Sequence, residues 1–180
     1  MKKFELTSET KINIFGKKLF RIKALISFAD VEAGETGGWV EKEGNVNQSG
    51  DAWVYGNAEV SGDAKVYGNA EVSGNAEVSG NAEVSGDAKV YGNAKVSGNA
   101  WVSDNAKVYG NADYTTIHGF GTQFRTTTFF RCKDKKVRVA CGCFFGTIPE
   151  FREQVKNTRK GKIAEEYLMI ADLMEKHFEK

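Results

Sequence analysis

A six-residue repeat through the middle of the chain constrains the fold more than any other feature of the sequence. A valine returns at every sixth position from Val54 to Val108, and an alanine keeps the same step from Ala52 to Ala112. Asn or Asp precedes each alanine, and Gly precedes that pair everywhere except at Asp104. The unit Gly-Asn/Asp-Ala-x-Val-x therefore recurs through eleven consecutive units. Repetition at a fixed period indicates a stack of similar units, each burying its apolar face against its neighbours.

The repeat unit itself predicts a short strand and a tight turn. Ala-x-Val-x alternates apolar and variable positions, so Ala and Val share the inner face of a strand. The Gly-Asn/Asp pair suits the turn, because both residue types tolerate a positive φ. Three units would close one triangular coil, and eleven units give between three and four coils. This period resembles that of the left-handed parallel β-helix family, and the left-handed direction is implied by that resemblance.

Stacking of such coils places outward side chains in rows whose members are three repeats apart. Most rows mix charged and polar side chains, which is typical of a solvated outer face. Large aromatic side chains on such a face favour contact with a partner. We therefore predict a homo-oligomer, with a trimer as the expected assembly, whose interface contains Trp53, Tyr55, Tyr91, Trp101 and Tyr109.

A stack of parallel coils leaves unpaired strand edges at both ends, so capping segments are required. We predict a mainly β protein in three parts. These are an N-terminal β cap (residues 1–47), a hexapeptide-repeat β-helix (48–116), and a C-terminal β-hairpin with a two-helix cap (117–180). Val40 and Val46 fall in the alanine register, so a first irregular coil is expected to begin before the perfect repeats.

The C-terminal part carries recognisable local signals. Two alternating segments predict a β-hairpin whose strands are residues 124–132 and 136–141. The segment Thr147-Ile148-Pro149-Glu150 is typical of a helix start, with Thr as N-cap, Pro in the first turn and Glu three residues after the cap. Apolar residues at helical spacing predict a second helix over residues 162–178.

The net charge of +1 conceals an asymmetry between parts of the chain. Residues 48–116 carry 4 basic and 9 acidic side chains, whereas residues 117–180 carry 13 basic and 8 acidic ones. The three cysteines are too few and too clustered for a disulfide framework, and no apolar signal segment follows Lys2 and Lys3. A cytoplasmic location is therefore expected. No apolar run approaches the roughly 20 residues that a membrane span requires, so no membrane partner is predicted.

Hexapeptide-repeat proteins are best known as acyltransferases, which generally use a histidine as general base between the subunits of a trimer. The repeats contain no histidine, and no loop interrupts them. The chain has only His118 and His177, and His177 lies near the end of the last predicted helix. An acyltransferase with His118 as base is the alternative function. No other catalytic residue is predicted.

Cysteines offer only a weak metal signal. Structural zinc usually draws on two closely spaced cysteine or histidine pairs. Here one short pair, Cys141 and Cys143, is joined by Cys132 and His118 as separate candidates. Small buried thiols in a hairpin and turn are the expected state. We predict neither a metal nor another cofactor.

The basic hairpin is the most suggestive binding signal in the sequence. Arginines on a strand hold phosphate in bidentate fashion, and neighbouring aromatic rings stack on a base. The ordinary alternative is a solvated edge whose lysines prevent sheet aggregation. Extensive binding of a nucleic-acid duplex is disfavoured, because the acidic repeats would repel phosphates beyond the hairpin. The predicted ligand-binding residues are Arg125, Phe129, Arg131, Lys133 and Arg138.

Four segments carry a wider resemblance: LFRIKAL (residues 19–25), GETGGWVEK (34–42), GDAWVYG (50–56) and CGCFFGT (141–147). Over nearly its full length, the chain resembles a family of small bacteriophage and prophage hexapeptide-repeat proteins, often described as acyltransferase-like. The expected function is a non-enzymatic, phage-derived binding protein that captures a host macromolecule or a nucleotide-like signal and so counters host defence. The expected partner is a host protein or a small phosphate-containing ligand. The alternatives are the acyltransferase with His118 as base and a structural virion or assembly component.

Overall fold

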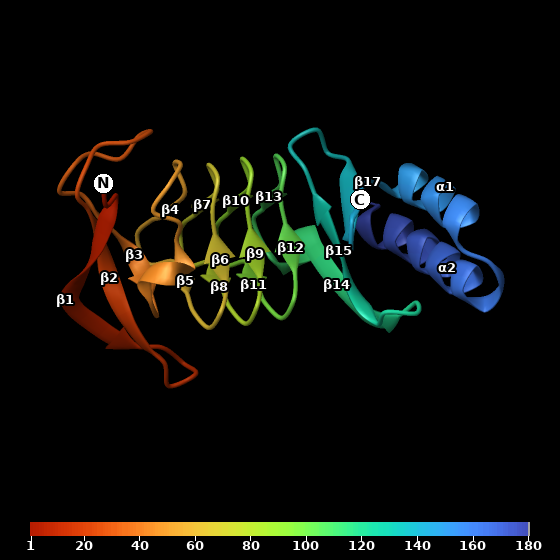
Figure 1. Cartoon of the computed structure of the whole chain (residues 1–180), viewed down its shortest axis with the longest axis horizontal. Helices are drawn as coiled ribbons and strands as arrows, with labels where there is room; N and C mark the ends of the chain where they lie inside the picture. Colours follow the sequence, from red (N-terminus) through yellow and green to blue (C-terminus); the bar gives the residue numbers. More distant parts are fainter. Residues whose placement is uncertain (180) are drawn as a thin grey trace. The chain divides into compact units, whose positions relative to one another are not determined.

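The computed structural model describes residues 1–179 as two compact units, Met1–Asn111 and the residues from Ala112 onward. In the first, called here the coil unit, the repeats form the predicted stack of parallel coils (Figure 1). Each of the first ten repeats contributes a two-residue strand, and paired strands are three repeats apart, as Glu71 with Lys89. These strands are β4 (Trp53–Val54), β5 (Glu59–Val60), β6 (Lys65–Val66), β7 (Glu71–Val72), β8 (Glu77–Val78), β9 (Glu83–Val84), β10 (Lys89–Val90), β11 (Lys95–Val96), β12 (Trp101–Val102) and β13 (Lys107–Val108).

The strands fall into three sheets, one for each side of the coil. One sheet has the order β4-β7-β10-β13, a second β6-β9-β12, and the third β5-β8-β11, which is extended by β3 (Thr36–Val40). Backbone groups bond successive coils, as where Trp53 N donates to Ala70 O at 3.0 Å. The mainly β architecture of stacked parallel coils is confirmed, and the left-handed direction stays an expectation from the resemblance.

Alanine and valine fill the interior of the stack. The repeat alanines from Ala52 to Ala106 and the repeat valines from Val54 to Val108 are each at most 1% exposed. Fully burying a valine stabilises the fold by about 1.5–3 kcal/mol relative to leaving it exposed. The variable positions between them point outward and carry mostly charged or hydroxyl side chains. The period of two within each repeat is therefore an inside–outside pattern.

Glycine at the corners sets how closely the coils approach. Gly80 has a φ of +68°, and a Cβ on it would lie 3.0 Å from the backbone N and O of Gly98. Gly98 has nearly the same φ, +70°, but ends its column, and a Cβ there would meet nothing within 4 Å. Asp104, with a φ of +61°, also ends a corner column, which explains a side chain where the repeat otherwise has glycine. Beside the glycines, Asn81 Nδ2 donates to Asn99 Oδ1 at 3.0 Å, one step of an amide ladder.

The first coil is two residues longer than the others. Val40 pairs with Val60 and Val46 with Val66, so both occupy valine positions. The predicted alanine register of Val40 and Val46 is therefore wrong, although an irregular coil does precede the perfect repeats. The extra residues lie between Val46 and Val54, a step of eight where the repeat has six. A turn of different length at one corner shifts the register without disturbing the inner face.

An antiparallel hairpin of β1 (Phe4–Ile12) and β2 (Lys18–Ala24) extends the sheet that contains β3. Its turn is held by Asn13, whose side chain accepts two backbone N–H bonds. β1 is the outermost strand of this sheet, and its register with β2 shifts between Leu6 and Thr10. Such an irregularity twists an edge strand and hinders its pairing with another chain. The hairpin therefore ends the sheet at a blunted edge.

Lys3 lies between this hairpin and the first coil. Its ammonium group donates to the carbonyls of Gly50 at 3.0 Å and Ala52 at 2.8 Å, and lies 4.8 Å from the centre of the Phe28 ring. Only 2% of the residue is exposed. Burial lowers the pKa of Lys3 from 10.5 to about 8, and the charge of Asp51 opposes part of that shift. Lys3 thus satisfies two carbonyls at the end of the stack while its charge is partly desolvated.

The C-terminal unit is a four-stranded antiparallel sheet, ordered β14-β15-β16-β17, packed with two helices. β15 and β16 form the predicted hairpin, and both predicted helices are present. The outer strands, β14 and β17, were not predicted. No helix within residues 1–179 is long and apolar enough to cross a membrane. The elements are β14 (Tyr114–Phe120), β15 (Arg125–Arg131), β16 (Val137–Cys141), β17 (Phe144–Thr147), α1 (Ile148–Thr158) and α2 (Gly161–Phe178).

Helix α1 begins as its sequence motif predicts. Thr147 Oγ1 accepts a bond from Glu150 N at 3.4 Å, and Glu150 Oε2 accepts one from Thr147 N at 2.7 Å, with Pro149 in the first turn. This reciprocal capping satisfies two backbone donors at the helix start. Both helices bury one face against the sheet in a core that includes Phe129, Val139, Phe151, Val155, Ile170 and Met174.

Replacing Gly80 with alanine should destabilise the protein more than replacing Gly98. Both variants place a side chain at a positive φ, which costs about 1–2 kcal/mol. Only the Gly80→Ala methyl group also meets the backbone of the next coil, which adds on the order of 1–3 kcal/mol. Free energies of unfolding from denaturant titrations would measure the difference. Equal losses in the two variants would show that corner spacing does not control the stacking.

Lys3 should make the free energy of unfolding rise with pH between about pH 8 and pH 10.5. Because its folded-state pKa is about 8 against 10.5 unfolded, the unfolded chain binds more protons between these values. The contribution of Lys3 to the free energy of unfolding therefore increases from pH 8 to pH 10.5. Denaturant titrations of the wild type and Lys3→Met across this window should show the difference between them growing in favour of the wild type. A constant difference would contradict the assignment.

Candidate functional site

The basic hairpin predicted to bind a ligand does not gather its side chains in one place. Arg125 begins β15 and Arg131 ends it, and this length of extended chain spans about 20 Å. Lys133 is exposed in the turn after β15. The predicted site is therefore divided between the two ends of the hairpin.

Arg131 and Arg138 have partners within the C-terminal unit. Arg131 donates to the carbonyl of Phe178 at 2.9 Å, and its guanidinium lies 3.6 Å from the Asp113 carboxylate. Arg138 donates to Asp134 at 2.9 Å, and this hydrogen bond is the main cause of the lowered pKa of Asp134. Both arginines thus have structural roles within the C-terminal unit.

The end of the hairpin that carries Arg131 borders a cavity of about 380 Å³. Glu175 and Glu179 line this cavity together with Arg131, Lys135 and Lys136. A wall of mixed charge attracts an anion less strongly than a wall that is basic throughout.

Phe129 is not placed to stack on a ligand. It is 0% exposed, and its ring meets the ring of Phe151 edge-on with the centroids 6.3 Å apart. The prediction that Phe129 binds a ligand is therefore wrong. The aromatic side chain belongs to the core between the sheet and α1, where burial of a large ring stabilises the unit.

Arg125, at the other end of the hairpin, borders a different cavity, of about 490 Å³. Arg125 and Arg159 both line it, and no lining residue is acidic. The rest of the lining comes from the loop after β14, the turn between β16 and β17, α1, and Tyr167 of α2. We call this cavity the basic pocket. Within residues 1–179, neither arginine forms an ion pair, so their charge is available to an anion.

Two glycines allow the side chains of the basic pocket to reach their positions. A Cβ on Gly142 would collide with the guanidinium of Arg125, and a Cβ on Gly121 would collide with the hydroxyl of Tyr167. Both glycines have a positive φ, 61° and 73° respectively. Arg125 therefore lies against the β16–β17 turn, and Tyr167 lies against the loop after β14.

Tyr167 connects the two arginines electrostatically. It is 7% exposed, and its hydroxyl donates to the carbonyl of Phe120 at 3.2 Å. Burial raises the pKa of Tyr167 and Cys141 adds to the rise, whereas the positive charges of Arg159 and Arg125 oppose it. Both guanidinium groups thus act on one buried hydroxyl. The fold has brought together two cations that are separated in the sequence by two strands and a helix.

Sequence reasoning missed Arg159, Tyr167 and Gln154 as residues of this pocket. The helical spacing of Phe151 and Val155 predicted which face of α1 is buried, but it could not predict which loop that face meets. The only signal was the excess of basic over acidic side chains in residues 117–180.

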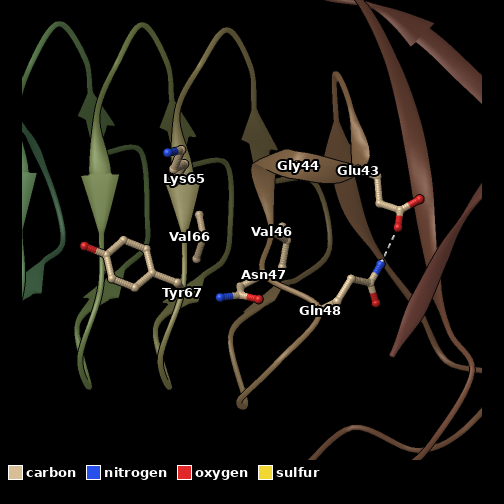
Figure 2. A pocket seen from close by; sticks show the side chains of 8 residues that line it. All are labelled: Glu43, Gly44, Val46, Asn47, Gln48, Lys65, Val66 and Tyr67. Carbon is tan, nitrogen blue, oxygen red and sulfur yellow. Dashed lines mark hydrogen bonds between the residues drawn. The ribbon is translucent and has the colours of Figure 1, made fainter. Parts of the chain in front are cut away.

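A cavity of about 460 Å³ lies in the coil unit, at the corner where the first coil has its extra residues (Figure 2). Figure 2 shows Gln48 reaching across this corner to Glu43, to which its amide donates at 2.9 Å. The same amide donates to the carbonyl of Phe4 at 3.1 Å, and its oxygen accepts from Lys3 N at 2.8 Å. The extra residues therefore anchor the N-terminal strand, which assigns Gln48 a structural role.

His118 and the cysteines do not form one site. His118 is exposed on β14, 3.2 Å from Thr126 Oγ1, and lines none of the three cavities. Cys132 is buried, Cys141 is half-buried and Cys143 is exposed, so the expectation of buried thiols is wrong for Cys143. Cys132 directly follows β15, whereas Cys141 is the last residue of β16. Within residues 1–179, no group of three or more His, Cys, Asp or Glu could hold a metal ion.

Comparison with known families bears on the coil unit. Residues 88–104, nearly one coil, match the family model described as YdcK Beta solenoid repeat. Together with the stacked parallel strands, this match decides the class. The chain is a β-solenoid repeat protein. It matches no curated protein.

The outward aromatic residues of the β-solenoid differ in exposure. Tyr109 is 63% exposed, and its ring meets that of Tyr91 edge-on with the centroids 5.2 Å apart. Tyr55, Tyr91 and Trp101 are half-buried, and Trp101 Nε1 donates to Ser85 Oγ at 3.3 Å. The role of these four aromatic residues in an oligomer stays a prediction.

Trp53 does not lie on the outer surface, so its predicted exposure to a partner is wrong. It is 0% exposed, because Phe4 and Phe28 pack edge-on against its ring with centroids 5.8 and 5.4 Å away. A Cβ on Gly37 would lie 2.6 Å from the same ring. Trp53 does pair with Glu71, the residue three repeats further along, as the stacking predicts. In the first coil, however, Phe4 and Phe28 cover this position.

Replacing Trp53 with alanine should destabilise the β-solenoid by about 3–5 kcal/mol, because it empties a buried aromatic site. It should leave the oligomeric mass unchanged. Denaturant titration and native mass spectrometry would measure the two quantities, with the exposed Tyr109→Ser as the comparison. A changed oligomeric mass with a stability loss below about 1 kcal/mol would instead place Trp53 in an interface.

Proposed function

We propose that this β-solenoid protein is a non-enzymatic binding protein that holds a small phosphate-containing, nucleotide-like ligand in the basic pocket. The observation that carries the proposal is the presence of Arg125 and Arg159 in a pocket that no acidic side chain lines. Arginine presents a planar fork of donors that matches phosphate oxygens, and hydrogen bonds between charged groups are stronger than those between neutral ones.

The size and lining of the pocket support a ligand larger than a free phosphate. Its volume of about 490 Å³ falls within the range of cavities that hold small organic ligands. Phe144 supplies a half-buried ring, and Gln123 and Gln154 supply exposed amides. Rings stack on bases and amides bond to base edges, so a heterocycle beside the phosphate suits this lining.

The β-solenoid is, in this proposal, a rigid scaffold. The resemblance to phage and prophage hexapeptide-repeat proteins supplies the biological setting. We propose that the protein is phage-derived and acts in the cytoplasm of the host cell, where capture of a nucleotide-like signal counters host defence. A homotrimer remains the proposed assembly, with Tyr55, Tyr91, Trp101 and Tyr109 as its interface candidates.

Adenosine monophosphate should bind the full chain, and Arg159→Ala should weaken binding by tenfold or more. Loss of a hydrogen bond between charged groups costs about 1.5–3 kcal/mol, which corresponds to that factor. Titration calorimetry with adenosine monophosphate, ribose phosphate and inorganic phosphate would measure the affinities, which should fall in that order.

Lys160→Ala is the matched control. It removes the same charge at the next position, but Lys160 does not line the pocket, so binding should change by less than about twofold. Equal losses in the two variants would show that net charge alone drives association. If none of the three phosphate compounds binds the wild type, the proposed function is wrong.

A further inference from the structure

We propose that Cys143 is a site of covalent modification by small anionic disulfides, of which glutathione disulfide is the cellular example. The inference uses the same pocket as the proposed function, but it does not require that a phosphate ligand binds there. It assigns a reaction to a residue that the proposed function leaves without a role.

Cys143 is distinguished from the other thiols by its position. It lies in the turn between β16 and β17, is exposed, and lines the basic pocket. Cys132 is 2% exposed. Cys141 also lines the pocket but is half-buried, and its sulfur accepts a hydrogen bond from Thr127 Oγ1 at 3.1 Å. A reagent that enters the pocket from solvent therefore reaches Cys143 most readily.

The cations of the pocket select the charge of that reagent. Arg125 lies against Gly142, the residue that joins the two pocket cysteines, and Arg159 lines the same cavity. Clefts lined by one sign of charge raise the encounter rate of an oppositely charged molecule by about 10- to 1,000-fold at low salt. Glutathione disulfide carries carboxylates on both halves, which arginine binds in bidentate fashion. One half can thus be held by the arginines while the disulfide bond approaches Cys143.

The reaction is thiol–disulfide exchange. The Cys143 thiolate attacks one sulfur of the reagent, a new bond forms between Cys143 and that sulfur, and the original disulfide bond breaks. The other half leaves as a thiolate and takes up the proton that the Cys143 thiol released. Cys143 is oxidised and the leaving half is reduced, so no further oxidant is needed. Negative charge spreads over three sulfurs in the transition state, which nearby guanidinium groups stabilise.

The test compares an anionic with a neutral disulfide on the full chain. Second-order rates are measured with dithiobis(nitrobenzoate), a dianion, and with dithiodipyridine, which is neutral, and each rate is divided by that of N-acetylcysteinamide with the same reagent. The normalised rates for the wild type should favour the dianion by about tenfold at low salt, and this preference should fall at about 0.5 M salt. Mass spectrometry of digests should place the adduct on Cys143, with glutathione disulfide as well.

Variants separate the role of the pocket from general charge. Arg159→Ala should lower the preference for the dianion towards one, and Arg159→Glu should reverse it, whereas Lys160→Ala should keep it. Cys143→Ser should abolish the fast reaction. A preference near one in the wild type, an unchanged preference in both Arg159 variants, or an adduct on Cys132 or Cys141 would overturn the inference.

Failure of this inference and failure of the proposed function give different results. Calorimetric binding of adenosine monophosphate without charge-selective modification leaves the proposed function standing and removes the reaction at Cys143. Charge-selective modification of Cys143 without binding of any phosphate compound supports the reaction at Cys143 and contradicts the proposed function. If both hold, saturating adenosine monophosphate should slow the modification of Cys143 by tenfold or more, because the two reagents share one pocket.

Discussion

Hydrogen bonding between backbones at a fixed offset of three repeats is the constraint on which the coil unit depends. Each repeat strand, from β4 to β13, has only two residues, so no single pair of them would be stable by itself. Stability comes from repeating the same pairing, with alanine and valine inside and glycine at the corners. Gly80 shows why the corners matter, because the backbone of the next coil occupies the space where its Cβ would lie. The interior, the corners and the outward rows all follow from that one offset.

Departures from the repeat occur where a neighbouring coil is missing. Asp104 stands at the end of a corner column, where no further coil needs the space of its side chain. At the other end of the stack, Lys3 bonds two carbonyls, Gln48 holds the first strand, and Trp53 is covered by aromatic rings. The side chains of these residues bond backbone groups and cover apolar surface that, elsewhere in the stack, the next coil bonds and covers. The end of a repeat array therefore needs specific residues in place of the repeated ones.

In the C-terminal unit, basic residues that are neighbours in sequence serve different purposes. Arg131 and Arg138 bond to groups of their own unit, whereas Arg125 reaches the pocket that Arg159 also lines. Ion pairs of the first kind stabilise a fold modestly. Cations without an acidic partner gain more from an external anion, which is why the pocket and not the hairpin supports the proposed function. The exposed thiol of Cys143 lines the same pocket and adds a reactive group to the proposed binding site.

The coil stack can be predicted from the amino-acid sequence alone, because the identity of each repeat residue follows from contacts with the same position one coil away. The sequence also predicts the hairpin and both helices of the C-terminal unit, where the signals are local, as in the capping box of Thr147 and Glu150. The register of Val40 and Val46, the burial of Trp53 and Phe129, and the placement of Arg125 and Arg159 in one pocket became visible only in the folded chain. These depend on contacts between segments distant in the chain and with no shared period. Periodicity reports local and repeated contacts, and it carries no information about a pocket assembled from a loop, a turn and two helices.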